Sequence, residues 1–183
     1  IPAMTAYHAV AKANLDAAST VLISGGAGAV AQYAIQFAKA RGAGVITTIS
    51  SEEKAKVARE AGADHCIDYK REDVGARMAE LTGSRGADAI VEMDLAANAK
   101  LIPVTLRPKG SVIVYGTAPE ATIPAMFCLQ NAITLQFFLV YQLEAAERDR
   151  RGRELGRDPQ QRWPLHSRER RCQRRQKTRS PGP

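Results

Sequence analysis

The chain alternates between short apolar runs and longer segments in which apolar residues recur at helical spacing. The apolar and β-branched runs predict six strands, at residues 21–23, 45–49, 65–68, 89–93, 111–115 and 133–141. Apolar residues at three- and four-residue spacing predict helices over residues 5–15, 30–39, 50–60, 72–81 and 95–106. A turn is predicted at residues 108–110, before the fifth strand.

Strands that alternate with helices of this length are typical of βαβ units, which form parallel sheets. Right-handed crossovers then predict an α/β fold with a doubly wound parallel sheet, the Rossmann fold, in the strand order 3-2-1-4-5-6. In such a sheet a ligand binds across the carboxyl ends of the strands. The residues that follow each strand are therefore the candidates for chemistry.

A glycine-rich turn joins the first strand to the next helix, in the sequence VLISGGAGAVAQYAIQFAK from Val21 to Lys39. Gly25 permits a tight turn, Gly28 lets a ligand approach the backbone, and the small Ala31 lets the helix pack close to the strand. The helix N-terminus directs free N–H groups and the positive end of its dipole toward an anion. This layout predicts a pyrophosphate site for a dinucleotide; the alternative is a purely structural turn.

The end of the second strand indicates which dinucleotide binds. An NAD site usually places an acidic residue there for the ribose 2′-hydroxyl, whereas this chain has Ser50 and Ser51, with Lys54 one helical turn further on. A hydroxyl and an ammonium group suit a 2′-phosphate, so the sequence favours NADP(H) over NAD(H). Glu52 could supply the missing acid. In a further alternative, Ser50 caps the helix in a capping box with Glu53, and Lys54 is only solvated.

Charge is distributed unevenly along the 183 residues. The net charge is +7, but residues 148–183 hold twelve arginines and one lysine against four acidic residues, so the rest of the chain is nearly neutral. Cys66, Cys128 and Cys172 lie far apart, which favours free thiols in a reducing cytoplasm. No apolar run is long enough to span a bilayer, and the three histidines form no cluster, so neither membrane association nor a metal site is expected.

Several separate motifs agree in order and spacing with one protein family. They are TAYHAV at residues 5–10, the glycine-rich stretch, TISSEEKAKVAREAGADHCIDYKRED at 48–73, ADAIVEMDLAANAK at 87–100 and GSVIVYG at 110–116. From Thr5 to Leu143 the chain resembles the medium-chain dehydrogenase/reductase superfamily, and within it the zinc-independent quinone oxidoreductase branch, the zeta-crystallin-like proteins. The resemblance implies an NADP(H)-dependent reductase built from a Rossmann domain and a catalytic domain.

The resemblance also implies which residues contact the cofactor. They are, for the pyrophosphate, Gly25, Ala27, Gly28, Ala29 and Val30; for the 2′-phosphate, Ser50, Lys54 and Tyr69; and for the remaining parts, Asn98, Gly116, Thr117, Phe138 and Leu139. Structural roles stay equally open for Tyr69 and Asn98. No catalytic side chain is implied, because in this branch the cofactor supplies the chemistry and the protein supplies the geometry.

By this resemblance the chain has three parts. Residues 1–19 are a helical lead-in from a catalytic domain that is missing here, residues 20–144 are the NAD(P)-binding Rossmann domain, and residues 145–183 are the arginine-rich tail. The implied reaction is hydride transfer from NADPH to a quinone or enone, with the chain alone expected to bind cofactor without efficient turnover. A homodimer is expected through the apolar edge strand from Ile133 to Tyr141; the alternative is that the missing domain covers this strand.

The arginine-rich tail has two explanations, and disorder is expected in either case. It is a basic arm for nucleic acid or an acidic partner, or it results from a shift of reading frame near Arg150; its abrupt start favours the second. Nucleic-acid binding is accordingly the less favoured property. Two other functions stay open: a non-catalytic NADPH-binding protein with a nucleic-acid-binding tail, and an enoyl or zinc-dependent alcohol reductase of the same superfamily.

Overall fold

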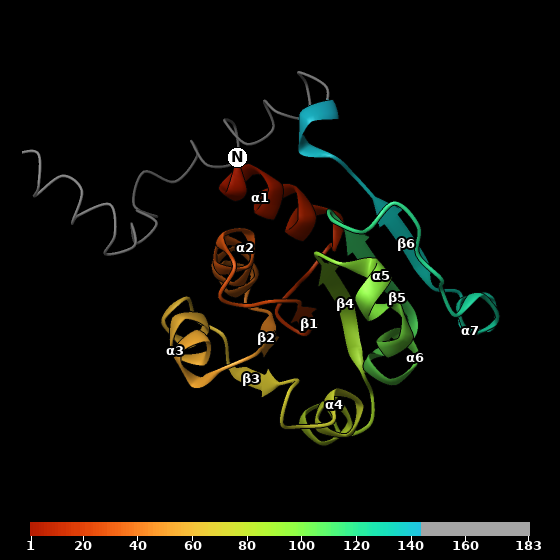
Figure 1. Cartoon of the computed structure of the whole chain (residues 1–183), viewed down its shortest axis with the longest axis horizontal. Helices are drawn as coiled ribbons and strands as arrows, with labels where there is room; N and C mark the ends of the chain where they lie inside the picture. Colours follow the sequence, from red (N-terminus) through yellow and green to blue (C-terminus); the bar gives the residue numbers. More distant parts are fainter. Residues whose placement is uncertain (144–183) are drawn as a thin grey trace, which may run out of the picture. The chain divides into compact units, whose positions relative to one another are not determined.

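Six parallel strands form one sheet in the order β3-β2-β1-β4-β5-β6 (Figure 1). A computed structural model describes residues 1–143, so the arginine-rich tail lies outside the described residues. The strands are β1 (Thr20–Ile23), β2 (Gly44–Ile49), β3 (His65–Asp68), β4 (Ala87–Glu92), β5 (Leu106–Val114) and β6 (Thr134–Phe137). The predicted doubly wound α/β fold and its strand order are confirmed.

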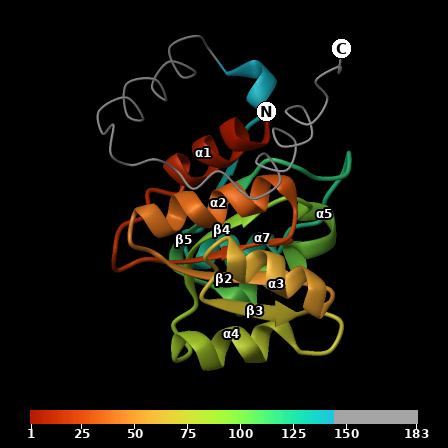
Figure 2. The same ribbon diagram turned by 90° about the vertical axis from the view of Figure 1, so that its left-hand side faces the viewer.

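Helices cover both faces of this sheet. They are α1 (Pro2–Lys12), α2 (Ala29–Ala40), α3 (Glu52–Glu60), α4 (Val74–Thr82), α5 (Leu95–Asn98), α6 (Ile102–Thr105) and α7 (Ala125–Gln130), with 3-10 turns η1 (Ala99–Leu101) and η2 (Val140–Gln142). Figure 1 shows α1, α2 and α3 on one face and α4, α5 and α6 on the other. In Figure 2, α1 lies over α2, where the rings of Tyr7 and Phe37 meet edge to face. No helix within residues 1–143 is long and apolar enough to cross a membrane.

The central strands are apolar on both faces, as a parallel sheet covered on both sides requires. One cluster packs against α4, α5 and α6, and its strand residues are Leu22, Ile46, Ile67, Ala87, Ile90, Leu106, Val112 and Val114. The residues that alternate with them are buried on the opposite face: Val21, Ile23, Val45, Val91 and Ile113. Because both faces of the sheet are buried in this way, the ends of the strands are where a polar site can form.

Several predicted elements differ in detail from the structure. The helix predicted over residues 95–106 is broken into α5, η1 and α6. The turn predicted at 108–110 lies inside β5, where Lys109 has a φ of +61° and the pairing with β4 shifts register. The edge strand is shorter than predicted, because β6 ends at Phe137. Helix α7 was not predicted, and none of its residues is buried in the structure.

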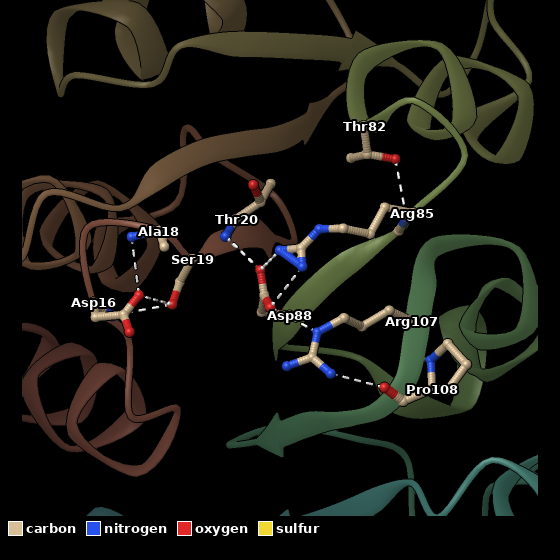
Figure 3. A network of polar contacts seen from close by, with 10 residues as sticks. Asp16, Ala18, Ser19, Thr20, Thr82, Arg85, Asp88, Arg107 and Pro108 are labelled. Carbon is tan, nitrogen blue, oxygen red and sulfur yellow. Dashed lines mark hydrogen bonds and ion pairs between the residues drawn. The ribbon is translucent and has the colours of Figure 1, made fainter.

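A polar network joins three strands at the amino-terminal edge of the sheet (Figure 3). Asp88 on β4 accepts the backbone N–H of Thr20 on β1 at 2.7 Å and the Nε–H of Arg107 on β5 at 2.6 Å, and it pairs with Arg85. Burial by itself would raise the pKa of Asp88, but these donors and the two positive charges bring the pKa below its ordinary value. The network stabilises the edge of the sheet that lies opposite the candidate site.

Candidate cofactor-binding site

The predicted site residues lie along one edge of the sheet. They are Gly25, Ala27, Gly28, Ala29 and Val30 after β1, Ser50 and Lys54 after β2, Tyr69 after β3, Asn98 after β4, Gly116 and Thr117 after β5, and Phe138 and Leu139 after β6. Because all six strands are parallel, their carboxyl ends share this edge. The fold therefore brings together residues that are spread over more than a hundred positions of the chain.

The glycine turn between β1 and α2 is tight and closed by its own backbone. Gly25 has a φ of +67°, and a Cβ atom there would lie 2.7 Å from the Sδ atom of Met93. The N–H of Gly28 donates to the carbonyl of Gly25 at 2.8 Å. Gly25 thus serves the turn in the way that the sequence predicts, since an L side chain would be both strained and crowded at this position.

Two threonines of β2 hold this turn against the sheet. The hydroxyl of Thr48 accepts the N–H of Gly25 at 3.0 Å, and its carbonyl accepts the N–H of Gly26 at 2.9 Å. The fully buried Thr47 would collide with any Cβ atom on Gly26. Sequence reasoning assigned both threonines only to a strand; the signal that could have revealed them was a polar pair at the end of an apolar run.

The N-terminus of α2 is open to an anion. Gly28 is the N-cap of this helix, and no side chain caps it. The N–H groups of Ala29, Val30 and Ala31 lie in the first turn, where an α-helix has no internal partner for them. Together with the helix dipole they form a donor set that fits a diphosphate, which brings both acceptor oxygens and negative charge.

The end of β2 carries a hydroxyl and an ammonium group in contact. The Nζ atom of Lys54 donates to the Oγ atom of Ser50 at 2.7 Å on the surface. The suggestion that Ser50 caps α3 is wrong, because the N-cap is Ser51, whose hydroxyl accepts the backbone N–H of Lys54 at 3.4 Å. Glu52, the possible substitute for the acid of an NAD site, forms an ion pair with Arg59. This arrangement fits a 2′-phosphate better than a free ribose hydroxyl.

A cavity of about 300 Å³ lies beside the glycine turn. Its volume is at the lower end of the range for small-molecule pockets, about 300–1,000 Å³. Ser24 and Gly25 border it on one side, and Tyr69 and Asn98 belong to the same lining, with Tyr69 53% exposed. Its inner wall is apolar and made by residues of the sheet and of α5 and α6: Leu22, Ile90, Leu95, Ile102 and Val112.

Glu92, the last residue of β4, is a polar member of this lining that sequence reasoning missed. Its Oε2 atom accepts the hydroxyl of Ser24 at 2.6 Å, and its Oε1 atom accepts the N–H of Asp94 at 2.6 Å and the Nδ2–H of Asn98 at 2.9 Å. Burial, and then the charge of Glu92, raise the pKa of the Tyr115 phenol, which stays protonated. An acidic residue directly after the apolar run of residues 89–91 was the available signal.

The residues predicted for the nicotinamide half follow β5 and β6. Gly116 has no room for a Cβ atom, which would meet the carbonyl oxygen of Met93. The N–H of Phe138 donates to the carbonyl of Val114 at 3.1 Å, so this N–H serves the sheet and the carbonyl of Phe138 is the group that a ligand could use. The Nζ atom of Lys12 lies 5.8 Å from the centroid of the Phe138 ring, which links α1 to this end of the site.

Residues 1–143 do not fit a metal site. Among them, no three histidine, cysteine, aspartate or glutamate side chains are placed to hold one ion. Cys66 and Cys128 are free thiols, and burial raises the pKa of each. No chemical step is therefore assigned to a metal ion in this part of the chain.

Comparisons with known proteins agree with this geometry. A family model described as zinc-binding dehydrogenase matches residues 29–151. An NAD-dependent alcohol dehydrogenase from Saccharolobus solfataricus is 34% identical over 115 residues, which are 62% of this chain and 33% of that protein. A quinone oxidoreductase from Pseudomonas aeruginosa is 35% identical over 105 residues, 57% of this chain and 32% of that protein. The chain thus spans about a third of the length of these relatives.

A solved structure supports the same relationship. A mycobacterial protein in complex with NADPH superimposes on this chain with a TM-score of 0.75 and 28% sequence identity, over 85% of this chain and 50% of that one. At this TM-score and coverage the two proteins share the same overall fold. The predicted resemblance to the medium-chain dehydrogenase/reductase superfamily is confirmed.

Proposed function

Because the chain belongs to the zinc-binding dehydrogenase family, within the medium-chain dehydrogenase/reductase superfamily, we propose that residues 1–143 bind NADP(H) for hydride transfer to a quinone or enone. The observation that carries the proposal is the uncapped N-terminus of α2 on the same sheet edge as the Lys54–Ser50 pair. One element suits the diphosphate and the other suits the 2′-phosphate. The NADPH complex of the mycobacterial neighbour gives the proposal independent support.

Each residue has a defined part in this proposal. The N–H groups of Ala27 and of residues 29–31 bind the diphosphate, and Ser50 and Lys54 bind the 2′-phosphate. Gly116, Thr117, Phe138 and Leu139 border the nicotinamide half, where they exclude water and orient the ring. When bound, NADPH supplies the hydride. The protein supplies position and a desolvated surface, so no side chain of residues 1–143 needs to act as a strong acid or base.

Lys54 offers the sharpest test of cofactor choice. Wild type and Lys54→Ala are titrated with NADPH and with NADH, following the fluorescence of the reduced nicotinamide. Lys54→Ala should weaken NADPH binding about five- to tenfold, because a charged hydrogen bond to phosphate is lost at an exposed site, and should leave NADH binding nearly unchanged. Lys56→Ala is the matched control, since Lys56 is an exposed lysine on the same helix.

Two results would contradict the assignment. Equal affinity of the wild type for NADPH and NADH would overturn the preference for NADP(H), and tighter binding of NADH would favour NAD(H), the cofactor named for the archaeal relative. Equal weakening of both cofactors by Lys54→Ala would place the 2′-phosphate elsewhere. This chain alone is expected to bind cofactor without efficient turnover, so rapid reduction of a quinone by NADPH in its presence would overturn that expectation; a zinc-dependent alcohol reductase would instead oxidise an alcohol.

A homodimer through β6 belongs to the same proposal. β6 is an edge strand, and Phe137 at its end is 58% exposed, with Leu139 and Tyr141 exposed just beyond. An apolar edge strand presents unpaired backbone groups that a second copy can pair with. A twofold axis beside β6 would satisfy these groups with the same strand of the partner.

A further inference from the structure

Glu92 is a buried carboxylate surrounded by neutral donors. Its side chain is 3% exposed, and within the described residues its partners are the hydroxyl of Ser24, the backbone N–H of Asp94 and the amide of Asn98. Burying a charge is costly unless hydrogen bonds replace the lost water. Three short bonds do so here, which makes the position of this carboxylate well defined.

The register of the sheet explains why Glu92 and Ser24 meet. Ile23 of β1 pairs with Val91 of β4, so the next residue of each strand, Ser24 and Glu92, lies side by side at the carboxyl edge. Ser24 is also the last residue before the glycine turn. Glu92 therefore connects the glycine turn with the segment that leads from β4 into α5.

Glu92 also fixes the orientation of the Asn98 amide. Asn98 directs its NH₂ group toward Glu92, because its Nδ2–H donates to the Oε1 atom. The other end of the amide, the Oδ1 atom, then has no hydrogen-bond donor among the described residues, and Asn98 belongs to the cavity lining. The cavity lining consequently contains a hydrogen-bond acceptor, the Oδ1 atom of Asn98, and the bond from Asn98 to Glu92 fixes the orientation of this amide.

We propose that Glu92 is a positioning residue that holds the Asn98 amide oxygen ready to accept a hydrogen bond from the ligand base, and so makes the cavity select adenine over hypoxanthine. Adenine carries a donor amino group at C6, where hypoxanthine carries a carbonyl acceptor. The apolar inner wall suits the purine ring, and Thr48 and Tyr69 in the lining place the cavity at the carboxyl ends of β2 and β3, where β2 leads on to the Ser50–Lys54 pair. This inference rests on the proposed NADP(H) binding.

The test compares NADPH with its analogue in which hypoxanthine replaces adenine. Fluorescence titration of the wild type should show a preference of about five- to tenfold for NADPH, the range expected for one good hydrogen bond replaced by a repulsive contact. Glu92→Met, which removes the acceptor but keeps the length of the side chain, should reduce this preference to nearly one. Asn98→Ala should do the same, and the double variant should lose nothing further.

The conservative variant distinguishes positioning from simple damage to the fold. Glu92→Gln can keep its Oε1 acceptor toward Asp94 and Asn98 and donate from Nε2 to the Ser24 hydroxyl, so it should retain most of the preference for adenine. A merely structural role would weaken both dinucleotides equally and leave their ratio unchanged. If Glu92→Met does not fold, the ratio in Asn98→Ala and its retention in Glu92→Gln still decide the matter.

The outcomes separate this inference from the proposal on which it rests. If the wild type binds neither dinucleotide, both are wrong. If the wild type binds both with equal affinity, or if Glu92→Met or Asn98→Ala keeps the full preference for adenine, NADP(H) binding stands and the role of Glu92 is wrong. Loss of preference in Glu92→Gln as well would also overturn the role, because that variant keeps the acceptor.

Discussion

The Asp88→Asn variant keeps the shape of a half-buried side chain and removes its charge. Asn can still accept through one oxygen, but its NH₂ group must face one of the donors of Thr20, Arg85 or Arg107. A hydrogen bond to a charged group contributes about 1.5–3 kcal/mol. Each ion pair contributes only about 0.2–1 kcal/mol, because the two arginines are 49% and 33% exposed. The variant should therefore lose about 2–4 kcal/mol of unfolding free energy near pH 7.

The loss should depend on pH with a defined sign. The pKa of Asp88 in the folded chain lies below its ordinary value, so its contribution is complete above the pKa of the unfolded chain, about 3.9. The contribution disappears as pH falls through the lower pKa of the folded chain. Urea unfolding at about pH 7, 5 and 3 should thus show the wild type and Asp88→Asn converging in free energy of unfolding as the solution becomes acidic.

Two controls accompany this measurement. Glu120→Gln changes an exposed carboxylate in a loop and should leave the free energy of unfolding nearly unchanged at every pH. Binding of NADPH by Asp88→Asn should equal that of the wild type under conditions where both are folded, because Asp88 lies at the amino-terminal edge of the sheet. A variant as stable as the wild type at pH 7, or a difference that stays constant down to pH 3, would refute the reasoning.

Two further predictions concern the turn and the edge strand. Gly26→Ala should lower stability by about 1–3 kcal/mol, seen as a lower urea midpoint, because its Cβ atom collides with buried Thr47; Gly28→Ala, with only a carbonyl 3.2 Å away, should be the milder change. Phe137→Lys should convert a dimer into a monomer in size-exclusion chromatography with light scattering, whereas Val104→Lys, another exposed apolar position, should not. A wild-type monomer would refute the β6 dimer.

The order of elements was predictable because apolar periodicity survives local irregularity. Leu95, Ala99 and Ile102 keep helical spacing across α5, η1 and α6, so the pattern could not reveal that the helix is broken. The Pro-Lys-Gly sequence at 108–110 is typical of a turn, yet the N–H of Lys109 donates to the carbonyl of Asn131 and the strand continues through an irregular step. In both cases tertiary packing overrides local preference.

The site was predictable only where its chemistry is local in the sequence. The glycine turn is formed by residues within a few positions of one another, and so is the Ser50–Lys54 pair, and both were identified. The contacts of Thr48 with Gly25 and of Glu92 with Ser24 join residues 23 and 68 positions apart. These contacts follow from the parallel register of the strands. Apolar periodicity does not predict which single residues of two neighbouring strands lie side by side.

The two edges of the sheet use polar groups in opposite ways. At the amino-terminal edge, a carboxylate meets donors from three segments and its bonding capacity is filled within the protein. At the carboxyl edge, Thr48 accepts the N–H of Gly25, and Glu92 accepts the hydroxyl of Ser24 and the amide N–H of Asn98. The first-turn N–H groups of α2 and the amide oxygen of Asn98 are left for a ligand. Substitutions at the first edge should therefore change stability with little effect on affinity. Substitutions of the supporting groups at the carboxyl edge, Thr48 and Glu92, should change ligand preference more than they change the stability of the fold.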